Sequence, residues 1–101
     1  MIIYNVTVKV NWPIHDDWLK WMMDIHIPEV IGTGCFEKHQ LVRLLEIDEA
    51  EGPTYSVQYY ATTRTKYDEY IQLYSASLRQ KSIALWGDQF IAFRTIMEIV
   101  N

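Results

Sequence analysis

The sequence predicts an α+β protein of the ferredoxin-like type, in which a four-stranded antiparallel sheet carries two helices on one face. The first observation is the order of the hydrophobic periodicities, since a strand, a helix and a second strand occur twice along the chain. The second is the length of 101 residues, half of them hydrophobic, which suits a single domain over residues 1–101. Right-handed crossovers then place both helices on the same face of the sheet.

The first strand is predicted at residues 2–12, where apolar and polar side chains alternate. Successive side chains of a strand point to opposite faces, so this pattern predicts one buried face and one largely polar face. The residues assigned to the buried face are Ile2, Tyr4, Val6, Val8, Val10 and Trp12.

The first helix is predicted to begin at Pro13, which suits a first helical turn because its missing N–H is not needed there. Pro28 is expected to kink or divide this helix, and the Gly-Thr-Gly sequence at 32–34 is expected to end it. At about 100° per residue, the apolar arc of the helix consists of Ile14, Trp18, Trp21, Met22 and Ile25.

A hairpin is predicted next, with strands at 36–47 and 55–62 and a turn at 48–53 that contains Gly-Pro and several acidic residues. A second helix follows at residues 65–86, where tyrosines and apolar residues recur at helical spacing.

The ends and the middle of this second helix carry local signals. Thr65 with Asp68 resembles a capping box at its start, and Gly87 is a good residue to end it. Ser75 and Ser77 are expected to bend the helix.

The last strand is predicted at residues 90–100. The face assigned to the core carries Ile91, Phe93, Thr95, Met97 and Ile99. The sheet face without helices is assigned Asn5, Thr7, Lys9, Gln58, Tyr60, Arg94, Ile96 and Glu98. A face of this mixed character is either exposed to water or closed by a second copy of the sheet.

Arg94 stands out in the last strand, because an arginine within a sheet needs a partner. Glu98 or a carboxylate of a partner chain is the expected partner, and an anionic ligand is the alternative. Lys9 is a second candidate to pair with Glu98 across strands.

Composition excludes several classes of function. The net charge of −4 argues against a nucleic-acid partner, because such binding depends on Lys and Arg. No basic cluster is present to bind an anionic membrane, and no apolar run approaches the roughly 18 residues of a membrane span. No signal peptide is expected, and the lone Cys35, expected to be small and buried, cannot form an intrachain disulfide. We therefore expect a cytoplasmic protein without a membrane or nucleic-acid partner.

Eight segments, spread over the whole chain, resemble a known family of proteins of this length. They read MIIYNVTVKV, WLKWM, HIPEV, TGCF, RLLE, EGPTYSVQYY, LRQK and FIAFRT. The family is domain of unknown function 4286. More distantly, the pattern is similar to the dimeric α/β-barrel superfamily, which includes small monooxygenases, haem-degrading enzymes and stress-responsive proteins. This resemblance implies a homodimer that pairs sheet face to sheet face, with a pocket between each sheet and its helices.

The same resemblance disfavours haem. Haem-degrading members use an Asn on the first strand, a Trp, and a His on the second helix. Asn5 or Asn11 would supply only the first of these, and the segment 65–86 contains no histidine. We therefore predict a protein without a cofactor.

The candidate ligand-binding residues are His15, Trp18, Met22, His26 and Tyr59. His15, Leu19, Met22 and His26 form a stripe along one side of the apolar arc of the first helix. Trp12, Trp18 and Trp21 could line the pocket of a flat, apolar ligand, but tryptophans at helical spacing more often belong to the core.

His26 is the best candidate for catalysis, because a histidine can carry a proton near neutral pH. The structural alternative is that its ring caps carbonyls freed by Pro28. His15 lies about 16 Å away along a helix, so the two histidines cannot share a metal ion. Although His26 and Glu29 are three residues apart, the expected kink lies between them, and no metal is predicted.

Three functions follow from these observations. The leading hypothesis is a small cytoplasmic homodimer that binds an apolar or aromatic small molecule. The alternatives are a cofactor-free monooxygenase-like or isomerase-like enzyme with His26 as acid or base, and a protein-interaction module that uses the open sheet face. A cavity between the first helix and the sheet would favour a ligand, whereas a solid core there would remove the enzyme.

Overall fold

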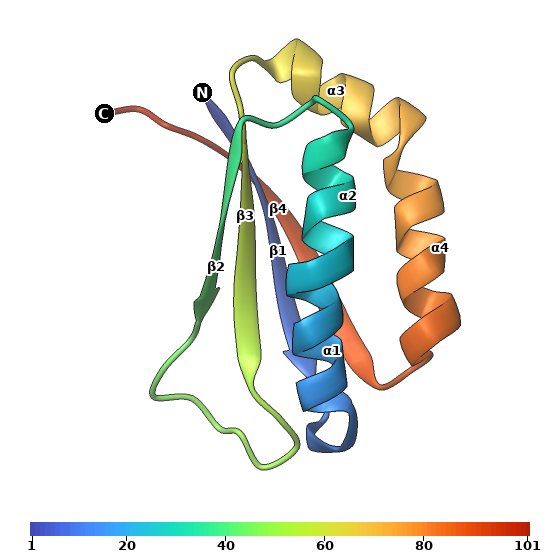
Figure 1. Cartoon of the computed structure of the whole chain (residues 1–101). Coiled ribbons are helices and arrows are strands. Elements are labelled where there is room, and N and C mark those ends of the chain that lie inside the picture. Colours follow the sequence, from blue (N-terminus) through green and yellow to red (C-terminus); the bar gives the residue numbers. More distant parts are fainter.

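The computed structural model describes residues 1–101 and contains a four-stranded antiparallel sheet in the order β2-β3-β1-β4, with the helices on one of its faces (Figure 1). The strands are β1 (Ile2–Val10), β2 (Lys38–Arg43), β3 (Thr54–Ala61) and β4 (Phe90–Glu98). The α-helices are α1 (His15–Trp21), α2 (Ile27–Gly32), α3 (Arg64–Leu73) and α4 (Ser75–Trp86). This arrangement confirms the predicted ferredoxin-like α+β fold. None of the helices combines the length and the hydropathy that crossing a membrane requires.

The hydrophobic core lies between the helices and the sheet and contains 17 buried residues. Its middle is aromatic, with the Tyr4 ring 6.1 Å from that of Phe36 and the Phe36 ring 4.9 Å from that of Tyr70. Rings at such distances stabilise one another beyond the area they bury. Trp18 and Trp21 belong to this core, as predicted.

The first helical segment contains a π-helical turn (Met22–His26) between α1 and α2. The backbone N–H of Ile27 donates to the carbonyl of Met22, five residues earlier. Pro28 explains the turn, because it has no N–H to donate to the carbonyl of Asp24 and its ring would clash with that carbonyl in a regular α-helix. The predicted interruption therefore takes the form of a local widening.

This turn also corrects the predicted apolar arc. Ile25, assigned to the arc, is 49% exposed, whereas Ile27 is 3% exposed. Uniform spacing of about 100° per residue fails here, because a π turn holds more residues per turn than an α-helix.

β1 ends at Val10, and the prediction that Trp12 belongs to its buried face is wrong. Trp12 begins a 3₁₀ turn (Trp12–Ile14), is 44% exposed, and donates its indole N–H to the backbone carbonyl of Glu49 at 2.8 Å. The ladder stops because Pro13 has no N–H to donate. The N–H of Trp12 instead donates to the carbonyl of Glu51 at 2.9 Å.

The hairpin has shorter strands than predicted. β2 covers six residues, because Cys35 and Phe36 before it are buried in the core. Residues 44–53 after it return to the end of β1, where the N–H of Val10 donates to the carbonyl of Pro53 at 3.1 Å. At Gly52, a β-carbon would lie 1.7 Å from the carbonyl oxygen of Val10, so only glycine fits this crossing.

The second helical segment is divided at Tyr74 into α3 and α4. The hydroxyl of Ser75 donates to the carbonyl of Ile71 at 2.9 Å, which agrees with the predicted bend at the serines. The predicted cap at Thr65 is wrong, since Thr63 accepts a hydrogen bond from the N–H of Lys66 at 3.2 Å and α3 begins one residue after it.

The segment ends as predicted at Gly87. Its φ of 58° and ψ of −126° lie where a residue with a side chain is strained, although outside the αL region that was expected.

The facing of β4 differs from the prediction. Arg94 pairs with Val6 of β1, so Arg94 and its alternate neighbours Ile96 and Glu98 point toward the helices. The open face instead carries Ile91, Phe93, Thr95 and Met97. The sequence could not settle this choice, because both faces of β4 are partly apolar and only the pairing with β1 distinguishes them.

The predicted pairing of Lys9 with Glu98 is also wrong. Lys9 lies on the open face, as predicted, and its ammonium group is 3.7 Å from the carboxylate of Glu51. No ion pair joins Arg94 to Glu98: five of the six ion pairs of the chain involve other arginines and lysines, and the sixth involves His15.

We predict that Gly52→Ala lowers the free energy of unfolding by about 3 kcal/mol, because the added methyl group overlaps the backbone of Val10. Gly32→Ala is the matched control, since nothing lies within 4 Å of its β-carbon position and its φ is not positive. It should be neutral or slightly stabilising. Urea denaturation of both variants tests this, and equal stability of the two would contradict it.

Candidate functional site

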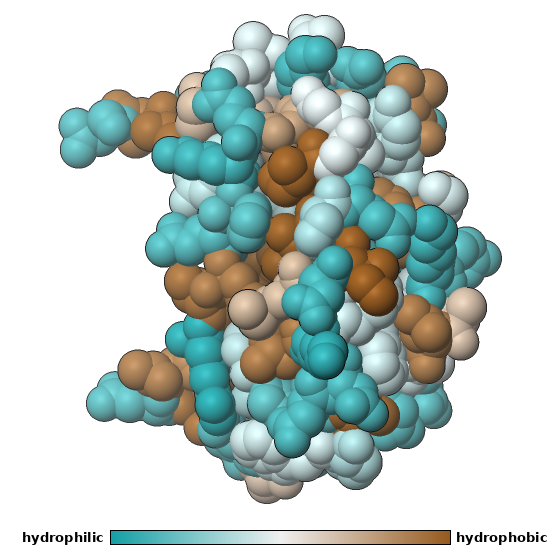
Figure 2. Space-filling model, viewed as in Figure 1, coloured by the Kyte–Doolittle hydropathy of each residue, from teal (hydrophilic) through white to brown (hydrophobic).

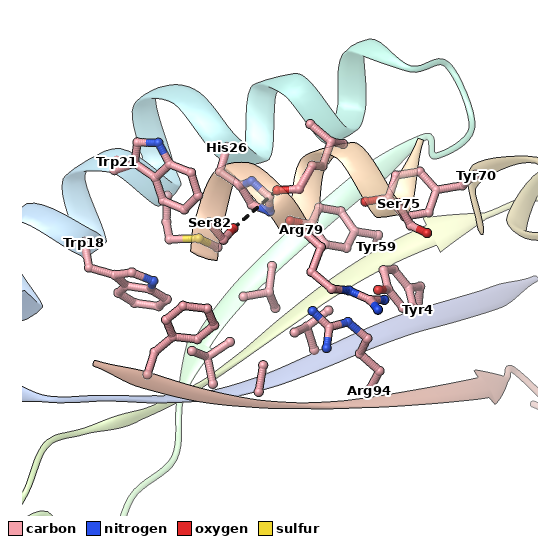
Figure 3. A pocket seen from close by; sticks show the side chains of 17 residues that line it. Tyr4, Trp18, Trp21, His26, Tyr59, Tyr70, Ser75, Arg79, Ser82 and Arg94 are labelled. Carbon is pink, nitrogen blue, oxygen red and sulfur yellow. Dashed lines mark hydrogen bonds between the residues drawn. The ribbon is translucent and has the colours of Figure 1, made fainter. Parts of the chain in front are cut away.

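A cavity lies between the first helical segment, α4 and the helix-facing side of the sheet (Figure 3). Its volume is about 60 Å³, and 12 of the 17 residues that line it are hydrophobic. The space between the first helix and the sheet is therefore not a solid core. Apolar walls with a few converging polar groups are typical of sites for small molecules.

Four of the five predicted ligand-binding residues line this cavity. They are Trp18, Met22, His26 and Tyr59. Trp18, Met22 and Tyr59 are buried, so these side chains belong to the core and form the cavity wall at the same time. Their role in ligand binding stays a prediction.

The π turn brings His26 to the cavity. The imidazole ring stacks on the indole of Trp21, with ring centroids 4.7 Å apart and planes 24° apart. Residues five apart lie above one another in a π turn, whereas they point in different directions in a regular α-helix. The ring thus packs on an aromatic neighbour, which differs from the predicted alternative of a cap on the carbonyls near Pro28.

Burial lowers the pKa of His26 from 6.5 to about 4. The carboxylate of Glu29 raises this pKa, and the positive charges of Lys81 and Arg94 lower it further. The imidazole is therefore neutral at pH 7, with one nitrogen that donates a hydrogen bond and one that accepts.

His15 does not line this cavity, so the predicted stripe does not form one wall. Its Nε2 lies 2.7 Å from the hydroxyl of Tyr55, and its Nδ1 lies 2.9 Å from the carboxylate of Asp16. Leu19, another member of the stripe, lines a separate groove between the first helical segment and β2. Figure 2 shows hydrophobic side chains gathered along this groove. The stripe divides because the π turn rotates the residues that follow it.

Two arginines that were not predicted at the cavity also line it, Arg79 of α4 and Arg94 of β4. A signal for Arg79 was available, because the α4 residues that line the cavity are spaced as one helix face. These residues are Ser75, Leu78, Arg79 and Ser82. The position of Arg94 depends on the facing of β4, which pattern alone did not determine.

The remaining polar groups of the cavity include tyrosine hydroxyls. Burial raises the pKa of Tyr59 and of Tyr70, so both remain protonated donors at neutral pH. No group of three His, Cys, Asp or Glu side chains lies together as a metal site would require.

Residues 1–100 match the family described as Domain of unknown function (DUF4286), and the chain belongs to this family. No curated protein matches the sequence.

Several solved structures share the fold. An ethyl tert-butyl ether d (ethd) family protein from Bacillus halodurans is 9% identical with a TM-score of 0.73, covering 99% of this chain and 100% of that one. A dimeric ferredoxin-like protein from an uncultured marine organism is 13% identical with a TM-score of 0.62, covering 99% and 96%. A putative antibiotic biosynthesis monooxygenase from Bordetella bronchiseptica is 17% identical with a TM-score of 0.62, covering 99% and 98%. At these identities the similarity shows the fold alone.

We predict that His26 makes the protein less stable as the pH falls from 6.5 to about 4. In this range the unfolded chain takes up a proton on His26 that the folded protein excludes, so its contribution lowers the free energy of unfolding by about 1 kcal/mol per pH unit.

The measurement is the difference in unfolding free energy between the wild type and His26→Gln across this range. The subtraction removes the titration of the other histidines and the carboxylates, which both proteins share. Loss of stacking on Trp21 shifts the variant's curve by a constant, whereas the titration changes its slope. Parallel curves would contradict the prediction.

Proposed function

We propose that this member of the DUF4286 family is a homodimer that binds an apolar or aromatic small molecule in the cavity between the first helical segment, α4 and the sheet. The observation that carries the proposal is the cavity itself, which has mainly hydrophobic walls and a small set of polar groups. A well-formed apolar pocket with converging polar groups is the usual form of a ligand site.

The size of the cavity limits the ligand. An apolar cavity of about 150 Å³ holds benzene, and the space here is about 60 Å³. A ligand with one aromatic ring therefore needs side chains to move at the mouth. Arg79 lines the cavity and is exposed, so its side chain can change rotamer.

The open sheet face supports the homodimer. Phe93 and Ile91 of β4 are 67% and 58% exposed on this face, and Met97 adds to the same apolar strip. Such exposed apolar side chains favour burial against another surface. A second copy of the chain presents the same strip, and one of the proteins that share this fold is described as dimeric. A different protein is the alternative occupant of this open face.

Catalysis by His26 has less support than ligand binding. A general base works best when its pKa lies near the working pH, and the pKa of His26 is about 4. One protein of the same fold is described as a putative antibiotic biosynthesis monooxygenase, which keeps a cofactor-free enzyme as the second candidate. The neutral imidazole suits a hydrogen bond to a ligand better than proton transfer.

We predict that Ala92→Val, which fills the cavity from β4, weakens binding of benzyl alcohol at least fivefold and stabilises the protein by about 1 kcal/mol. Binding is followed by the indole N–H resonances of Trp18 and Trp21, with the exposed Trp12 as internal reference. Thr62→Val, an exposed change outside the cavity, is the control and should alter neither property. Unchanged affinity in Ala92→Val would count against this cavity as the site.

We also predict that Phe93→Asp converts the dimer to a monomer, because it places a charge in the apolar strip of the open face. Size-exclusion chromatography with light scattering gives the mass in solution. Leu85→Asp is the matched control, since Leu85 is also exposed but belongs to α4. A wild-type protein that is monomeric at high concentration would overturn the homodimer and leave a different chain as the occupant.

A further inference from the structure

We infer that the ligand is an organic anion, whose acidic group lies between Arg79 and Arg94 and whose apolar body contacts Trp18 and Trp21. This inference rests on the proposed function, because it assigns a chemical class to the occupant of the same cavity. The arrangement of charge around that cavity supports it.

The two arginines come from different layers of the fold and converge. Figure 3 shows the guanidinium groups of Arg79, from α4, and Arg94, from β4, pointing toward one another beside Tyr4. Two positive charges that face each other repel, and an anion between them would remove this repulsion. Guanidinium groups also match the planar geometry of a carboxylate.

The chain supplies no carboxylate to this pair. None of the residues that line the cavity is Asp or Glu, and none of the six ion pairs includes Arg79 or Arg94. Five of the nine basic residues do pair with a carboxylate, as Lys81 does with Glu29 at 2.7 Å. The chain has 13 acidic residues and 9 basic ones, so the two arginines lack a carboxylate partner although carboxylates outnumber cations in the chain.

Neutral donors complete the polar end of the cavity. Tyr59 and Tyr70 line the cavity, and a tyrosine hydroxyl can donate a hydrogen bond to an oxyanion. Trp18 and Trp21 lie on the other side of the cavity (Figure 3) and offer large apolar ring surfaces for contact with rings and alkyl groups. A small inorganic anion would leave these apolar walls unused, whereas an aromatic acid satisfies both ends.

Benzoate and benzyl alcohol test the inference, because they differ little in shape and only benzoate carries a charge. Benzoate should bind the wild type at least tenfold more tightly, as followed by the indole resonances of Trp18 and Trp21. Arg79→Gln and Arg94→Gln should each weaken benzoate binding about tenfold more than they weaken benzyl alcohol binding. Arg64→Gln removes the same charge from an exposed position of α3 and should change neither.

The outcomes separate the two proposals. Equal affinity for benzoate and benzyl alcohol in the wild type would overturn the anion and leave the proposed small-molecule site intact. Failure of both compounds to bind would overturn the proposed site and this inference with it. If the arginine variants do not fold, the salt dependence of binding to the wild type is measured instead. Benzoate affinity should fall as sodium chloride is added, while benzyl alcohol affinity stays constant. Benzoate binding that is independent of salt would overturn the inference.

Discussion

The missing backbone N–H of Pro28 is the constraint on which the arrangement of the first helical segment depends. It replaces one α-helical turn with the π turn at Met22–His26, and every residue after that turn is rotated relative to a regular helix. Ile25 is thereby exposed, Ile27 enters the core, and His26 stacks on Trp21 at the cavity. One proline thus determines both how the segment packs on the sheet and which of its histidines reaches the cavity.

The electrostatic character of the cavity follows from burial and from the choice of neighbours. His26 is neutral at pH 7 because desolvation outweighs the nearby Glu29. Tyr59 and Tyr70 remain neutral for the same reason. The positive charge at the site therefore comes from the arginines, which have guanidinium groups too basic to titrate. A site of this kind keeps its charge across the physiological pH range.

The order of elements and the fold were predictable because hydrophobic periodicity reports which residues face the core. The same reasoning identified Trp18, Met22, His26 and Tyr59, which the structure brings to one cavity. It failed where packing and strand pairing, and not the local hydrophobic pattern, decide which way a side chain faces. His15 was grouped with His26 on the assumption of a regular helix, and Arg94 was placed on the open face because both faces of β4 carry apolar residues. The pairing of strands and the position of a π turn both depend on contacts that a single segment does not encode.

Phe93 and Arg94 are consecutive in β4 and point to opposite sides of the sheet. The apolar strip of the open face and the cation of the cavity are therefore fixed by one register. A shift of one residue in the pairing of β4 with β1 would turn Arg94 toward the outside and Phe93 toward the helices. A change of register therefore cannot move the apolar strip without also removing the cation from the cavity, so the surface offered to a partner and the charge offered to a ligand must change together.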